Sequence, residues 1–201
     1  AGGMIMVGIP RYRLPREVID REVAMLEDLG VEFQYNTRFG VDVDLDALRN
    51  EGFEAFFFAI GAHTSFKLGI PGESDFPQVI DAIDLLRNVA LGDRHAPGKK
   101  VVVIGGGNVA IDAARTSLRL GAEAVSIAYR RTRKEMPADE EEIEQAEDEG
   151  VHLEFLSVPV EVVGEGDRVV GLKCLRARME AVEGSKRMRP VPVEGSEHLL
   201  E

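Results

Sequence analysis

The chain has 201 residues, of which 44% are hydrophobic and 30% are charged, and its formal net charge at pH 7 is −12. The apolar fraction is sufficient for a packed core, which excludes a disordered or fibrous chain. The negative charge argues against nucleic acid or an anionic membrane as a partner. No apolar run reaches the roughly 20 residues of a membrane helix, and no basic start followed by an apolar core has the pattern of a signal peptide.

The chain contains one cysteine, Cys174. An intrachain disulfide and a cysteine-rich metal site therefore cannot form, and a reducing, cytoplasmic compartment fits this usage. Cys174 lies in the apolar-alternating stretch 169–175, where we expect a buried small hydrophobe. The chain opens with Ala1 and stops at Glu201 without a helix cap or a strand end, so we expect a piece of a larger protein.

The first third of the chain predicts helices and strands in alternation. Apolar residues at helical spacing predict a helix at 16–29, and a short helix is expected at 46–50. Alternating polarity predicts a strand at 31–35. The continuous apolar run at 55–60 is typical of a strand buried on both faces of a parallel sheet. A linker is expected at 72–77, followed by a helix at 79–91.

The centre of the chain predicts one βαβ unit. A short buried strand at 99–104 leads into a glycine turn at 105–107 and an alanine-rich helix at 108–120. A second buried strand follows at 124–129. This succession of strand, turn, helix and strand within about 30 residues is a βαβ unit.

The remaining elements complete an α/β fold with a Rossmann-like parallel sheet, helices and a β-meander. A basic loop is expected at 130–137, an acidic helix at 138–149 and a strand at 151–158. Residues 161–163 and 169–178 predict a hairpin. The tail from Glu183 is polar, and we expect it to be irregular.

The glycine turn has the pattern of a dinucleotide-binding loop. Gly105 permits the tight turn, Gly107 lets the backbone approach a diphosphate, and Ala110 keeps the helix close to the strand. Its position between a strand and a helix supports this interpretation over a tight turn without a ligand. The amide groups at the helix start then face the phosphates. The predicted contacts are Gly105, Gly106, Gly107, Asn108, Val109 and Ala110.

The end of the second strand predicts which dinucleotide binds. An NAD site needs a carboxylate there, but no acidic residue occurs between Glu123 and Glu135. Guanidinium groups can hold the 2′-phosphate of NADP(H) with paired hydrogen bonds. The alternative is a set of solvated charges paired with the acidic helix. The candidate cations are Arg130, Arg131, Arg133 and Lys134.

These segments resemble the small (beta) subunit of NADPH-dependent glutamate synthase, within the FAD- and NAD(P)-dependent pyridine nucleotide-disulfide oxidoreductase superfamily. The flavin part of dihydropyrimidine dehydrogenase is also similar. The resemblance rests chiefly on residues 105–112 and 129–138, and extends to 8–15, 59–62 and 190–197.

The resemblance implies an NADPH domain inserted in a partial FAD-binding domain. Residues 1–75 would belong to the FAD domain, 76–194 to the NADPH domain and 195–201 to a truncated return. Ala59 and Gly61 would contact the cofactor. NADPH would reduce FAD, and electrons would pass to iron–sulfur centres and a large or electron-accepting partner subunit. The piece alone should be inactive.

The sequence alone leaves other functions open. An NADPH-dependent Fe(III) or ferredoxin reductase beta subunit would share the same flavin module. A short-chain dehydrogenase would need a Tyr-x-x-x-Lys pair, which Tyr12, Tyr35 and Tyr129 do not form. A dinucleotide-binding sensor would share the glycine turn but not the FAD-domain segments. The sequence predicts no catalytic side chain and no metal ligand.

Overall fold

The computed structural model describes residues 1–62, 64–182, 184 and 188–201. The chain divides into two compact units, Ala1–Thr64 and Ser65–Glu201. The second unit contains all six strands found in the described residues. No helix in these ranges is long and apolar enough to cross a membrane.

The first unit is helical and irregular. It contains α1 (Gly3–Val7), α2 (Arg16–Asp28) and α3 (Leu45–Asn50), which confirms the helices predicted at 16–29 and 46–50. The strand predictions at 31–35 and 55–60 are wrong, because both segments lack regular structure. The ring of Phe57 is 93% exposed. A strand needs a hydrogen-bonded neighbour, and the described residues of this unit provide only an isolated bridge between Phe39 and Val43.

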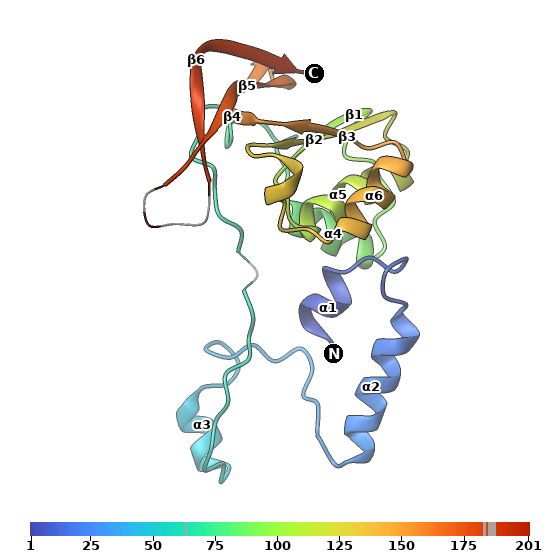
Figure 1. Ribbon diagram of the computed structural model, residues 1–201. Coiled ribbons are helices and arrows are strands. Elements are labelled where there is room, and N and C mark those ends of the chain that lie inside the picture. The colour runs from blue at the N-terminus through green and yellow to red at the C-terminus, as the bar shows by residue number, and fades with distance from the viewer. Residues whose placement is uncertain (63, 183, 185–187) are drawn as a thin grey trace. The chain divides into compact units, whose positions relative to one another are not determined.

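The second unit is built on a three-stranded parallel sheet. Its strands are β1 (Lys100–Ile104), β2 (Ala124–Tyr129) and β3 (His152–Phe155), in the order β1-β2-β3. Figure 1 shows α4 (Ala82–Ala90), α5 (Asn108–Arg119) and α6 (Glu140–Asp148) together on one side of this sheet. The predicted βαβ unit is therefore confirmed, with β2 as the central strand.

Small side chains allow α5 to lie close to the sheet. Ala113 and Ala114 are at most 1% exposed, and Ile111 is fully buried. They pack with Ile127 of β2 and Ile143 of α6, which are also fully buried. The alanine-rich sequence of α5 thus brings the first turn of the helix directly to the end of β1.

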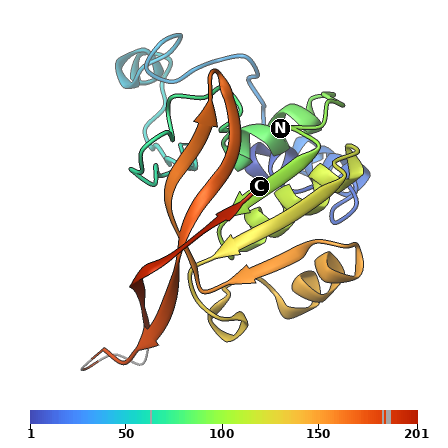
Figure 2. The ribbon, with the colours of Figure 1, turned by 90° about the horizontal axis from the view of Figure 1, so that it is seen from above.

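A second, antiparallel sheet follows. It consists of β4 (Ser157–Glu165), β5 (Arg168–Glu180) and β6 (Arg189–Leu200), in the order β4-β5-β6. Figure 2 shows these three strands as long, twisted ribbons. The predicted hairpin and α/β fold with a β-meander are confirmed. The irregular tail expected from Glu183 is wrong over residues 189–200, where the polar chain pairs with β5 through its backbone.

Two further features of the antiparallel sheet bear on the sequence predictions. Residues 151–158 do not form one strand, because Leu156 takes a left-handed backbone with φ 55° and separates β3 from β4. Cys174 is fully buried in β5, as expected. Burial raises the pKa of its thiol to about 11, which keeps the sulfur protonated and unreactive at neutral pH.

Ion pairs fasten α6 to α5. The side chain of Arg115, only 5% exposed, lies 2.6 Å from Glu142 and 2.8 Å from Glu149. Arg119 also contacts Glu149, at 2.5 Å. Hydrogen bonds from Arg119 and then from Arg115 outweigh partial burial and lower the pKa of Glu149 to about 2. The acidic helix predicted from sequence is therefore held by specific cations of α5.

We predict that replacing Glu149→Gln lowers the free energy of unfolding at pH 7 by about 3 kcal/mol, the low end of the range for breaking a buried pair. Because the folded pKa lies below the ordinary value, this stabilisation is present above about pH 4.5 and is lost as the pH falls toward about 2. The variant should therefore lose less stability on acidification than the wild type. Urea unfolding at several pH values measures both effects.

Glu123→Gln provides the control for this experiment. Glu123 pairs with Lys99 at 2.7 Å, but both side chains are mostly exposed. Removing an exposed pair costs less than about 1 kcal/mol. Equal losses for the two variants would contradict a special role for the pairs between α5 and α6.

Candidate functional site

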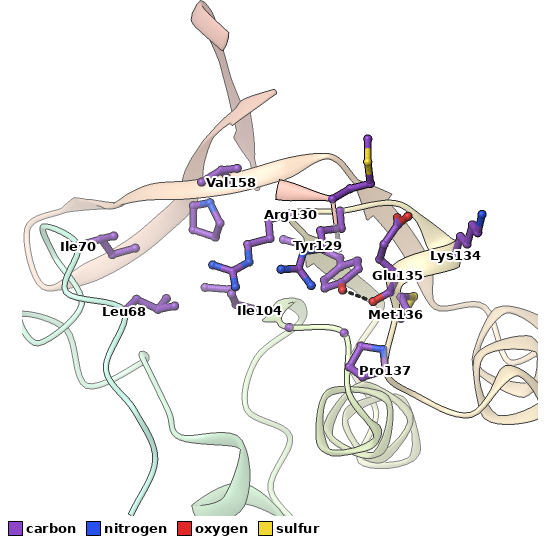
Figure 3. A pocket seen from close by; sticks show the side chains of 16 residues that line it. Leu68, Ile70, Ile104, Tyr129, Arg130, Lys134, Glu135, Met136, Pro137 and Val158 are labelled. Atoms are coloured by element: carbon purple, nitrogen blue, oxygen red, sulfur yellow. Dashed lines mark hydrogen bonds between the residues drawn. The ribbon is translucent and has the colours of Figure 1, made fainter. Parts of the chain in front are cut away.

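A pocket of about 920 Å³ lies at the carboxyl ends of β1 and β2. In open α/β sheets this edge is where ligands bind. One part of the lining is apolar and includes Leu68, Ile70 and Val158 (Figure 3). The other part combines the glycine turn with the basic loop after β2.

The glycine turn has the conformation that the sequence pattern requires. Gly105 has φ +137°, a backbone conformation that L side chains rarely adopt, and its amide donates to the carbonyl of Ala128 at 3.1 Å. Gly107 precedes α5, and the first intrahelical donor is Ala110, 2.9 Å from the Gly107 carbonyl. A helix leaves its first amides unbonded, so those of Asn108 and Val109 can receive an anion.

Gly106 is required by a neighbouring side chain. A Cβ added at Gly106 would lie 2.5 Å from Cε2 of Tyr129, whereas one added at Gly107 would meet its nearest atom, Cγ of Pro137, at 3.8 Å. The ring of Tyr129 therefore occupies the space above Gly106. This contact could not be predicted from the sequence, because it depends on the packing of β2 against the turn.

The basic loop is fastened to the glycine turn by hydrogen bonds. The hydroxyl of Tyr129 donates to the carbonyl of Glu135 at 2.6 Å. The amide of Ala138 donates to the carbonyl of Gly106 at 3.1 Å. The amide of Asp139 donates to Oδ1 of Asn108 at 3.0 Å. The basic loop, residues 130–137, is thus held over the turn by bonds at its middle and directly after its end.

Three of the four predicted cations line the pocket: Arg130, Arg131 and Lys134. Arg130 lies centrally in Figure 3, between Val158 and Ile104, while Lys134 points outward. Arg131 is half-buried, and its Nε is buried without a hydrogen-bond partner among the described residues. A buried donor of this kind needs an acceptor, which an oxyanion would provide.

Arg133, the fourth cation, has partners on α6. Its guanidinium lies 2.8 Å from Glu140 and 2.5 Å from Glu147, and it does not line the pocket. The hydrogen bonds that Arg133 donates to Glu147 and then to Glu140 raise the pKa of its guanidinium further. This geometry corresponds to the pairing with the acidic helix that the sequence left open.

One acidic residue, Glu135, is among the residues lining the pocket. Its Oε2 accepts hydrogen bonds from Oγ1 of Thr132 at 2.5 Å and from the Thr132 amide at 3.2 Å. The hydrogen bond from the Thr132 side chain is the main cause of its lowered pKa. The carboxylate is therefore ionised and held within its own turn.

The two remaining predicted contacts, Ala59 and Gly61, lie in the first unit. Both are exposed and belong to a segment without regular secondary structure. Their assignment to a cofactor stays a prediction.

Comparison with known proteins places this site in a family. Residues 17–186 match the profile of the pyridine nucleotide-disulphide oxidoreductases. The chain belongs to this family, which confirms the resemblance inferred from the sequence.

Relatives with longer chains resemble the protein over its whole length. The NADPH-Fe(3+) oxidoreductase subunit beta of Geobacter sulfurreducens is 45% identical over all of the chain, which covers 30% of that relative. The glutamate synthase [NADPH] small chain of Halomonas elongata is 39% identical over 99% of the chain, covering 44% of the relative. The chain thus spans less than half the length of these relatives.

Solved structures share the fold. FprA of Mycobacterium tuberculosis, an oxidoreductase, superposes with a TM-score of 0.77 over 98% of the chain and 59% of its own length. The two sequences are 19% identical, so this similarity concerns the fold alone.

We predict that Gly106→Ala destabilises the protein by about 1–3 kcal/mol, the usual cost of overpacking, because the Tyr129 ring must move. Gly107→Ala, at φ −96° and with its nearest neighbour in ordinary contact, should change stability little. Thermal unfolding of both variants measures the difference. Equal melting temperatures would mean that the ring does not occupy this space.

Proposed function

We propose that the second unit binds NADP(H) and that the protein is part of a flavoprotein in which NADPH reduces FAD. The observation that carries this proposal is that Arg131, whose Nε is buried without a hydrogen-bond partner among the described residues, lines the same pocket as the glycine turn. Membership in the pyridine nucleotide-disulphide oxidoreductase family supports it independently.

The glycine turn would hold the diphosphate. The backbone at Gly105 and Gly106 lines the pocket. The open space at the next residue, Gly107, leaves room for a ligand to approach. The amides of Asn108 and Val109 would donate to phosphate oxygens, aided by the positive end of the α5 dipole. Ala110 supports this arrangement by its burial at the start of the helix.

The cations after β2 would select the 2′-phosphate. Leaving a buried donor unsatisfied costs about 1–3 kcal/mol, so an acceptor at Arg131 Nε is worth a similar amount to binding. Arg130 would add charge around the same phosphate, and Lys134, which lines the pocket but points outward, would add charge at its edge. Arg133 would act indirectly by holding α6, because Glu140 and Glu147 occupy its guanidinium.

The bound nicotinamide would supply the hydride, and this chain would bind and orient it. The apolar lining formed by Leu68, Ile70 and Val158 offers a surface for a planar ring. The residues that line the pocket then bind and position the cofactor and take no covalent part in the reaction.

In the whole protein, we propose that residues 1–75 contribute to the FAD domain through Ala59 and Gly61, that 76–194 form the NADPH domain, and that 195–201 are a truncated return to the FAD domain. The names of the relatives support an NADPH-dependent redox complex with a partner subunit. Iron–sulfur centres would carry the electrons onward. The electrons would be used either for glutamate synthesis or for the reduction of Fe(III). A cytoplasmic location stays a prediction.

We predict that NADPH binds at least tenfold more tightly than NADH, and that Arg131→Ala weakens NADPH binding by about 1–3 kcal/mol while leaving NADH unchanged. The reason is that, in this proposal, Arg131 would contact only the extra phosphate. Isothermal titration calorimetry of the 201-residue chain measures both affinities. Equal binding of the two nucleotides by the wild type would overturn the proposal.

Arg133→Ala is the matched control, since it removes a neighbouring guanidinium that has acidic partners outside the pocket. Its effect on the ratio of the two affinities should be small. Arg130→Ala should resemble Arg131→Ala. A larger loss for Arg133→Ala than for Arg131→Ala would reverse the assignment of the cations.

A further inference from the structure

We propose that Tyr129 is a positioning residue for the 2′-phosphate: it fixes the basic loop against the glycine turn and thereby sets the preference for NADP(H) over NAD(H). This inference rests on the proposed function. In this proposal, Tyr129 contacts no phosphate itself but determines the positions of the cations that bind the phosphate.

The first support is the burial of the ring. Tyr129 is 8% exposed at the end of β2, and its ring lies over Gly106 at a distance that excludes even a methyl group. The ring therefore has one position relative to the turn. A phenylalanine would fill the same space, so this packing does not explain the hydroxyl.

The second support is the partner of the hydroxyl. It donates to the carbonyl of Glu135 at 2.6 Å, in the middle of the basic loop (Figure 3). The ends of the loop have their own attachments, since Leu156 donates to the Arg131 carbonyl and Ala138 to the Gly106 carbonyl, both at 3.1 Å. Among these bonds, the one from Tyr129 holds the short helix η1 (Arg133–Glu135), which carries Lys134 and Glu135.

The third support is the acid in this segment. The carboxylate of Glu135, in a pocket with three cations, is bound by Thr132 instead of by an arginine. The Tyr129 hydroxyl thus binds the main-chain carbonyl of Glu135, and Thr132 binds the carboxylate of the same residue. With either hold removed, the carboxylate can turn toward Arg130 or Arg131 and compete with an anionic ligand. Such competition weakens the binding of a nucleotide that carries a 2′-phosphate and leaves the binding of one with a 2′-hydroxyl unchanged.

The test uses 2′,5′-ADP and 5′-AMP as probes, because they differ only in the 2′-phosphate. With the 201-residue chain, Tyr129→Phe should weaken binding of 2′,5′-ADP about fivefold, the effect of one hydrogen bond, and leave 5′-AMP unchanged. Tyr35→Phe, at an exposed ring of the first unit, is the control and should change neither. Calorimetric titration gives the affinities, and circular dichroism checks folding.

A second variant keeps the test decisive if Tyr129→Phe unfolds. Thr132→Val removes the side-chain hydrogen bond to the Glu135 carboxylate and leaves only the one from the Thr132 amide, without touching the tyrosine. It should cause the same selective loss. Adding Glu135→Gln to Thr132→Val should restore binding of 2′,5′-ADP. A loss that the glutamine does not rescue would overturn the role assigned to the carboxylate.

The outcomes separate the two proposals. Equal wild-type affinity for both probes would contradict the proposed NADP(H) site itself. If the wild type prefers 2′,5′-ADP and Tyr129→Phe retains the full preference, the positioning role is wrong and the site stands. A matched loss for both probes would assign Tyr129 a structural role only.

Discussion

The site depends on one steric constraint: the chain must pass from β1 into α5 beneath the ring of Tyr129. A side chain at Gly106 would collide with that ring, so the glycine permits β2 and the turn to approach each other. The approach places the glycine turn that leads into α5 and the cations after β2 around one pocket. In the proposed function, the amides at the start of α5 and the cationic side chains would act on the same ligand.

The sequence predicted this unit well because its signals are local. A buried strand, a glycine turn and an alanine-rich helix follow one another within residues 99–120, and each element is recognisable from its own residues. Because β1 and β2 are neighbouring parallel strands, the cations that follow β2 lie at the same edge of the sheet as the glycine turn. Sequence could not determine that Arg133 contacts Glu140 and Glu147, because those pairs depend on where α6 packs.

The sequence predictions that were wrong or incomplete share a physical cause. In each case the structure depends on contacts between residues that are far apart in the chain. Residues 55–60 have the composition of a buried strand but no partner strand in the described part of their unit. β6 has proline, glycine and polar residues, yet backbone pairing with β5 makes it a strand, and prolines are tolerated at a sheet edge. The contact of Tyr129 with Gly106 was missed for the same reason, since neighbouring strands bring the two residues together.

The central claim is that Arg131 Nε is a donor kept for the 2′-phosphate. A ¹H–¹⁵N correlation spectrum of the arginine Nε–H groups tests it directly, with Arg131→Lys used to assign the signal. We predict that saturating NADP⁺ shifts the Arg131 signal strongly downfield, whereas saturating NAD⁺ leaves it near its position in the free protein. Equal shifts with both nucleotides, or none with NADP⁺, would contradict the account.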